Sequence, residues 1–252
     1  MNITYLGLEV RRLLRDPVSL FFTTGLPLVF YLVFGAAQDY GSQSVGNGNV
    51  AMMVMVSMAG YGAVTTAVGV GGRAAVERMQ GWGRQLGLTP LTDRGYVGVK
   101  VGLALIATSL TIALIFTAAA LTGAVGTASA WLLSGLALVI GAGMFALYGL
   151  IFGLGFRAEG AVAAASGSIV LLGLLGNVFV PLSGWMLAVA KVTPLYGLVS
   201  LARYPISNGY VLGSGGELLH EPLWVPVANV GAWLVVFAVL ATLLVRRSRG
   251  RQ

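Results

Sequence analysis

Long hydrophobic runs without charge, separated by short polar segments, dominate the pattern of this chain. Residues 19–37 form the first such run, and its 19 residues are close to the ~20 that a helix needs to cross the hydrocarbon core of a membrane. Similar runs predict six membrane-spanning helices, at residues 19–37, 50–72, 101–122, 130–156, 160–180 and 224–245. The pattern therefore predicts an all-α, polytopic membrane protein with a single transmembrane domain over residues 1–252.

The first 17 residues follow a different pattern, because apolar and basic positions repeat there at helical spacing. Such spacing predicts an amphipathic helix over residues 2–16 that lies at the membrane surface and stops at Pro17. A plain positively charged anchor and a cleaved signal peptide are the alternatives. The apolar face comprises Ile3, Leu6, Val10, Leu13 and Leu14, and the opposite face carries Arg11, Arg12 and Arg15.

Glycine and proline mark the places where the hydrophobic runs bend, pack or end. Pro27 removes a backbone donor within the first span, so we expect a kink there. Residues 123–129 predict the turn between the third and fourth spans. The pairs Gly98 with Gly102 and Gly149 with Gly153 have the four-residue spacing that allows close helix packing.

Residues 181–223 are too apolar for a free loop and too interrupted by proline for a full span. We expect short helices there that enter the outer leaflet and return, followed by a polar outer loop at residues 207–222. Residues 38–49, which contain no lysine or arginine, predict another outer loop.

Composition agrees with a membrane protein and indicates its orientation. Only 9% of the 252 residues are charged, against about 25% in globular proteins, and the mean hydropathy is +0.88. Thirteen of the fifteen lysines and arginines lie in segments that we assign to the cytoplasm, and Lys191 and Arg203 lie outside. This positive-inside distribution predicts six spans with both termini cytoplasmic, and it argues against nucleic-acid binding despite a net charge of +7.

The chain lacks the residues that several kinds of chemistry require. The chain has no cysteine, and neither of its two lysines follows the glycine-rich loop that an ATPase needs. Glu217, His220 and Glu221 lie close together in the sequence, but we interpret them as part of a solvated loop rather than as a metal site. The predicted spans contain no ionisable residue, which disfavours an ion-driven carrier and favours an apolar or amphiphilic substrate.

Residues 73–100 are the longest charge-rich segment, and they mix charged, aromatic and glycine residues in a way that suits docking to a partner. The segment resembles the cytoplasmic loop of type-2 ATP-binding-cassette (ABC) transporter permeases, which carry Glu-Arg, a glycine with an aromatic residue, Arg-x-Leu and Thr-Pro-Leu. The matching residues are Glu77, Arg78, Gly81, Trp82, Arg84, Leu86, Thr89, Pro90 and Leu91. Phe179–Pro181 and Thr193–Tyr196 also resemble the family's outer re-entrant segment.

The resemblance implies the membrane permease subunit of an exporter in the bacterial cytoplasmic membrane. It implies docking of ABC ATPase subunits that bind ATP and Mg, and pairing with a second copy or a similar permease. Export of a drug-like compound or lipid is the expected activity; alternatives are export of a polysaccharide or lipid-linked precursor, an ion-driven carrier or channel, and an intramembrane enzyme.

The transport path of such an exporter would run between the two permeases, among lipids, and would be lined by aromatic residues and methionines. Methionine suits varied ligand shapes because its thioether side chain is flexible and polarizable. The candidates on the spans and the outer segment are Phe30, Phe34, Met52, Met55, Phe179, Pro181, Trp185, Pro194 and Tyr196.

Overall fold

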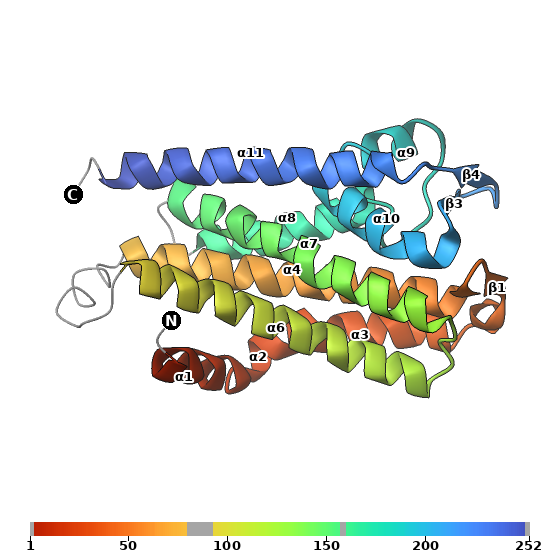
Figure 1. Ribbon diagram of the computed structural model, residues 1–252, viewed down its shortest axis with the longest axis horizontal. Helices are drawn as coiled ribbons and strands as arrows, with labels where there is room; N and C mark the ends of the chain where they lie inside the picture. Colours follow the sequence, from red (N-terminus) through yellow and green to blue (C-terminus); the bar gives the residue numbers. More distant parts are fainter. Residues whose placement is uncertain (1–2, 80–92, 157–159, 250–252) are drawn as a thin grey trace.

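The computed structural model describes residues 3–79, 93–156 and 160–249, and it shows an elongated bundle of helices (Figure 1). The described part is mostly helical, as expected from the hydrophobic runs. Among the described residues, five segments are long and apolar enough to cross a membrane: residues 17–36, 50–77, 98–121, 128–155 and 224–247. A bent pair of shorter helices could supply a sixth crossing.

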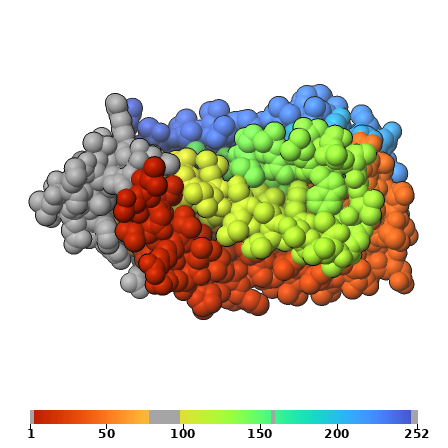
Figure 2. Space-filling view, turned by 60° about the horizontal axis from the view of Figure 1, so that its bottom comes forward, coloured from red at the N-terminus to blue at the C-terminus, as the bar shows by residue number. Residues whose placement is uncertain are grey.

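The N-terminal helix α1 (Ile3–Leu14) packs beside α6 (Asp93–Leu121), which contains the third membrane-length segment. Figure 2 shows α1 in red next to the yellow end of α6. Its apolar face is narrower than the sequence pattern indicates. Leu6 and Leu13 are buried, whereas Ile3 and Leu14 are exposed. Neighbouring helices cover only the centre of the apolar stripe.

The first long hydrophobic segment is a succession of short helical pieces. These are α2 (Pro17–Leu20), the π-helical η1 (Phe21–Gly25), α3 (Leu26–Tyr31) and the π-helical η2 (Leu32–Ala36). Asp16 caps α2 by accepting a hydrogen bond from the Ser19 backbone N–H at 3.0 Å. Pro27 sits at the start of α3, directly after a π-helical turn, which is a common way to accommodate the missing proline N–H.

The segment after the first span is folded rather than a free loop. It contains the 3-10 helix η3 (Asp39–Ser42) and a small hairpin of β1 (Ser44–Val45) and β2 (Gly48–Asn49). The Asn49 side chain accepts a hydrogen bond from the Met52 N–H and donates one to the Gly123 carbonyl at 2.8 Å. These bonds tie the start of α4 to the turn that follows α6.

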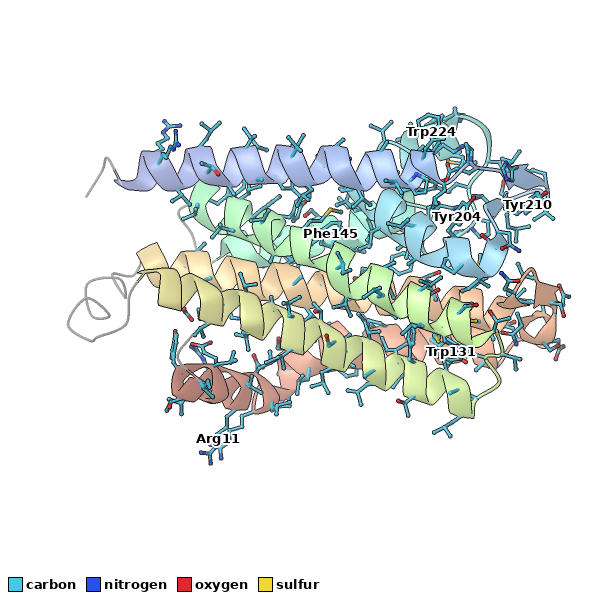
Figure 3. The ribbon with its side chains drawn as sticks, in the orientation of Figure 1. Arg11, Trp131, Phe145, Tyr204, Tyr210 and Trp224 are labelled. Atoms are coloured by element: carbon cyan, nitrogen blue, oxygen red, sulfur yellow. The ribbon has the colours of Figure 1, made fainter. Side chains whose placement is uncertain are left out.

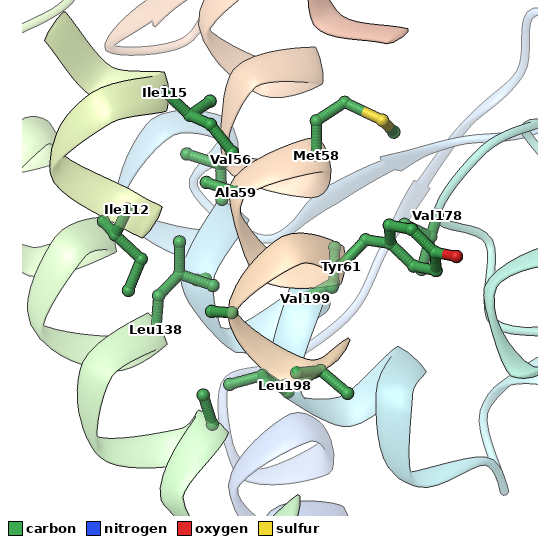
Figure 4. Close-up of a cluster of buried hydrophobic side chains, with 14 of the residues drawn as sticks. Val56, Met58, Ala59, Tyr61, Ile112, Ile115, Leu138, Val178, Leu198 and Val199 are labelled. Carbon is green, nitrogen blue, oxygen red and sulfur yellow. The ribbon is translucent and has the colours of Figure 1, made fainter. Parts of the chain in front are cut away.

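Helix α4 (Val50–Met79) is the central element of the bundle. Over the most apolar, membrane-length stretch of this helix 83% of the residues are buried, whereas over the corresponding stretch of the last helix, α11 (Trp224–Arg249), only 11% are buried. It is packed by α3, α6, α7 (Ala128–Gly155), α8 (Gly160–Leu175) and α10 (Pro194–Ser207). Figure 4 shows buried side chains gathered around one stretch of this helix, including Val56, Ala59, Leu138 and Leu198.

Close packing of α4 on α7 depends on glycine. A Cβ atom at Gly149 would lie 2.2 Å from the Val68 carbonyl oxygen, and one at Gly153 would lie 2.4 Å from the Ala75 Cβ. The expected close approach at this glycine pair is therefore present. At Gly98, by contrast, an added Cβ would meet nothing within 4 Å.

The region after α7 differs most from the expected spans. Helix α8 has 16 residues and ends at Leu175, short of the predicted end at residue 180. It is followed by α9 (Gly184–Ala190) and α10, which are bent by 94° relative to each other. The segment expected to be a polar loop contains a hairpin of β3 (Tyr210–Leu212) and β4 (Leu218–His220).

Candidate functional site

Two groups of polar side chains lie at opposite ends of the bundle, where the helix ends meet. The end that holds α1 also holds the last turns of α4 and the beginning of α6 (Figure 1). The other end holds both β-hairpins, α9 and α10. In Figure 3, Arg11 marks the first end, and Tyr204, Tyr210 and Trp224 mark the second.

Lys100 is the centre of an ion-pair cluster at the first end. Its Nζ atom lies 3.1 Å from Glu9 Oε2 on α1 and 2.7 Å from Glu77 Oε2 on α4. Arg12 Nη1 lies 3.5 Å from the other oxygen of Glu77. The Lys100 side chain is 9% exposed and each carboxylate is 12% exposed, so these charges are mostly shielded from water. This cluster joins three helices that are distant in sequence.

Arg73 and Tyr5 lie near this cluster and add to the polar interactions at this end of the bundle. Arg73 on α4 pairs with Asp16 at 3.2 Å and donates a hydrogen bond to the Ser19 hydroxyl at 3.0 Å, so it holds the start of the first span. Burial and the negative charge of Glu9 raise the pKa of Tyr5 above its ordinary value. Tyr5 therefore stays neutral beside the cluster.

Of the predicted docking residues, the structure describes the side chain of Glu77 and places it in this cluster. Arg78 is within α4, but its side chain is not described. The remaining docking residues lie outside the described residues: Gly81, Trp82, Arg84, Leu86, Thr89, Pro90 and Leu91. Of the three N-terminal arginines, Arg12 on α1 reaches Glu77, and Arg11 on α1 and Arg15 just after it are exposed.

A cavity of about 410 Å³ lies at the opposite end of the bundle. Its size is within the usual range for small-molecule sites. Its walls come from the end of the first span, the start of α4, the segment 176–181 after α8, α10 and β3. Apolar and aromatic side chains form most of the lining, including Phe34, Met53, Val54, Met58 and Phe179.

Glu221 lines this cavity and is almost completely buried, at 3% exposure. The Tyr196 hydroxyl donates to its carboxylate at 2.9 Å, the Ser200 hydroxyl donates at 2.8 Å, and Lys191 Nζ lies 3.2 Å away. The expectation of a solvated loop is therefore wrong for Glu221. Glu217 does stay exposed, and a hydrogen bond from Ser183 lowers the pKa of its carboxyl group. Within the described residues no group suited to a metal ion is present.

Arg203 on α10 is the cation of the cavity wall. Its Nε donates to the Ser57 hydroxyl on α4 at 2.8 Å, and Nη2 donates to the same hydroxyl. Nη1 donates to the Asn177 carbonyl at 2.9 Å, and Nη2 also donates to the Val178 carbonyl at 3.3 Å. Although no predicted span contains an ionisable residue, the fold thus brings a guanidinium against the second span.

The predicted path residues occupy several environments. Four of them line the cavity: Phe34, Phe179, Pro181 and Tyr196. Phe30 lies behind this wall, with its ring 5.9 Å from that of Phe179. Met52 and Met55 are fully buried in the core of this chain, Pro194 is buried at the start of α10, and Trp185 is 76% exposed.

The sequence analysis missed the polar residues of the cavity. Ser200 and Tyr204 were not candidates, and neither was Ser57, which binds Arg203. Glu221 was considered only as a metal ligand, and Arg203 was counted only as an outer cation. One signal for Arg203 was present, because it stands in a helix-forming apolar segment rather than in a polar loop. A basic residue in that context usually has a specific partner.

A comparison with curated proteins gives a distant relative. The chain is 25% identical over 246 residues to the Bacillus subtilis (strain 168) protein named "Putative transport permease YvfS", and the match covers 95% of this chain and 94% of the relative. No protein-family model matches the chain. With its membrane-length helices and this full-length likeness, the chain is a multi-pass membrane protein.

Proposed function

We propose that this chain is the membrane permease subunit of an ATP-driven exporter, moving an amphiphilic molecule such as a drug-like compound or a lipid out of the cytoplasm or the inner leaflet. The observation that carries this proposal is the likeness, along nearly the whole chain, to a protein named as a transport permease. ATP and Mg would bind to separate ATPase subunits, and a second permease, identical or similar, would complete the transporter.

The ion-pair cluster supports a mechanical connection between the proposed docking segment and the bundle. Glu77 stands near the end of α4, at the beginning of the motif that resembles the ATPase-docking loop of type-2 permeases. Lys100 and Arg12 bind the same Glu77 carboxylate from α6 and α1. A displacement of Glu77 would therefore act on three helices together, because mostly buried charges are costly to separate.

The cavity at the other end supports an amphiphilic substrate. Its walls are mainly apolar, but they also contain a guanidinium and several hydroxyl groups. A purely ionic substrate would lose hydration there without enough polar partners, whereas an amphiphile matches both parts of the lining.

Transport in vesicles tests the energy source. The full chain is purified from membranes of cells that make it naturally, together with any bound ATPase, and reconstituted with a fluorescent amphiphile. We expect transport that requires ATP and Mg, stops with vanadate and continues when a protonophore and ionophores remove all ion gradients.

The opposite result would identify another class of transporter. If no ATPase accompanies the chain and an ion gradient alone drives flux, the exporter proposal fails and a carrier or channel replaces it. Transport of sugar-linked lipids but not of simple amphiphiles would keep ATP-driven export and change the substrate to a polysaccharide precursor.

A further inference from the structure

We propose that the cavity between the first span, α4, α10 and β3 binds an amphiphile whose headgroup carries a carboxylate or phosphate, and that Arg203 recognises this anionic group. The proposal concerns binding and stands without the proposed function; only its extension to the exported substrate rests on that function. It follows from the charges and the lining of the cavity.

Arg203 has incomplete bonding within the described part of the chain. A guanidinium carries five N–H donors, and Arg203 makes four hydrogen bonds, all to neutral acceptors on Ser57, Asn177 and Val178. The Ser57 hydroxyl can accept from Arg203 because it directs its own proton to the Met53 carbonyl at 2.6 Å. One Nη1 donor remains, and no carboxylate of the described residues pairs with this cation.

Glu221 does not neutralise Arg203, although both residues line the cavity. Its carboxylate is already bound by Lys191 Nζ at 3.2 Å and by the hydroxyl groups of Tyr196 and Ser200. The pair of Glu221 and Lys191 is formally neutral, so the lining keeps the positive charge of Arg203. A cation at a half-buried, low-dielectric wall attracts an anionic ligand more strongly than the same cation in water.

The rest of the cavity suits an apolar ligand body rather than a free anion. Phe34, Val54, Met58, Val178 and Phe179 line it, and the Tyr61 ring lies 4.9 Å from that of Phe179. Phe34 and Val180 are about half exposed, so they border the side of the cavity that faces the surroundings. An alkyl chain or ring system could lie against this wall while its headgroup reaches Arg203.

Binding of matched probes to the purified full chain tests the charge preference. The anionic probe is dansylaminoundecanoic acid, and the neutral probe is its amide, which has the same length and fluorophore. We expect the acid to bind about tenfold or more tightly than the amide, because a hydrogen bond between two charged groups is stronger than one to a neutral group. Inorganic phosphate and acetate, added as competitors, distinguish a free anion site from an amphiphile site.

Two variants locate the binding. Arg203→Met should lower the affinity for the acid at least about tenfold and leave the affinity for the amide nearly unchanged. Phe34→Ala should weaken both probes alike, about fivefold, because it removes only apolar contact. Arg246→Met, at the opposite end, removes the same charge and should change neither affinity.

The comparison of the two probes on the unmodified chain keeps the test valid if Arg203→Met does not fold. Equal affinity of acid and amide, or unchanged acid binding in a folded Arg203→Met variant, would overturn the proposal. Full displacement of the acid by millimolar phosphate or acetate alone would also contradict it, because the site would then recognise an anion without an apolar body. The assay contains no ATP, so its failure would not count against the exporter proposal.

Discussion

At the residue scale, the mostly buried carboxylates of this membrane protein are held by specific partners at the two ends of the bundle. Lys100, Glu9 and Glu77 form one group, and Glu221 with Lys191 forms another. Each brings together elements that are distant in the sequence. Because a mostly buried charge without a partner is costly, these residues contribute to stability only as complete groups.

Replacing Lys100 tests this dependence. Lys100→Met would leave the carboxylates of Glu9 and Glu77 close together without their shared cation, and we expect the free energy of unfolding to fall by about 3 kcal/mol. The measurement is detergent-induced unfolding of the purified chain, followed by tryptophan fluorescence.

A second substitution separates charge from packing. Adding Glu77→Gln to Lys100→Met removes the excess negative charge and should recover part of the loss. The surface variant Arg246→Met should unfold like the unmodified chain, and the assignment would be wrong if Lys100→Met did the same.

At the element scale, α4 determines the packing of the other helices. It is buried on nearly all sides. Glycines on both helices allow α4 and α7 to approach closely: a Cβ atom at Gly71 of α4, for example, would lie 2.0 Å from the Ala146 carbonyl oxygen of α7. Without a hydrophobic driving force between helices in lipid, such close backbone contact is a main source of association.

Glycine-to-alanine changes on α7 test the contact. Gly149→Ala would place a methyl group 2.2 Å from the Val68 carbonyl oxygen, so we expect a loss of about 1–3 kcal/mol in the free energy of unfolding. Gly143→Ala is the matched control on the same helix, where an added Cβ meets nothing within 4 Å. It should be neutral or slightly stabilising, since alanine favours helix. Equal effects of both changes would show that the α4–α7 contact is looser than described.

At the scale of the whole molecule, the cation-rich end and the hairpin end define an orientation. Figure 1 shows α1 and the end of α11 toward one end and both hairpins at the other. In Figure 3, Trp131 and Trp224 lie toward the hairpin end, as in the aromatic belt of a membrane protein. With basic residues gathered at the α1 end, we expect that end to be cytoplasmic.

Thiol labelling tests the orientation, and the chain has no native cysteine to interfere. In intact cells, a membrane-impermeable maleimide should label Ser214→Cys, in the exposed turn of the outer hairpin, and should not label Arg11→Cys on α1. Both should react after the cells are opened. Labelling of Arg11→Cys alone in intact cells would reverse the proposed topology.

The sequence alone determined the helical class, the long hydrophobic segments and the amphipathic N-terminal helix. These features are local: a helix satisfies its own backbone hydrogen bonds, and the length of an apolar run decides whether it can cross a membrane. The same reasoning could not identify α4 as the central helix, because every span is apolar and hydropathy alone does not distinguish lipid contact from protein contact.

Only the tertiary structure decided which polar residues meet. Arg203 reaches Ser57 across 146 positions of the sequence, and Glu221 enters the bundle from a segment that looks like a solvated loop. The positions of these side chains depend on the 94° bend between α9 and α10 and on the packing of α10 against α4. Such contacts form when elements that are distant in the sequence pack together. The hydrophobic pattern of each segment by itself does not show which partner it will pack against.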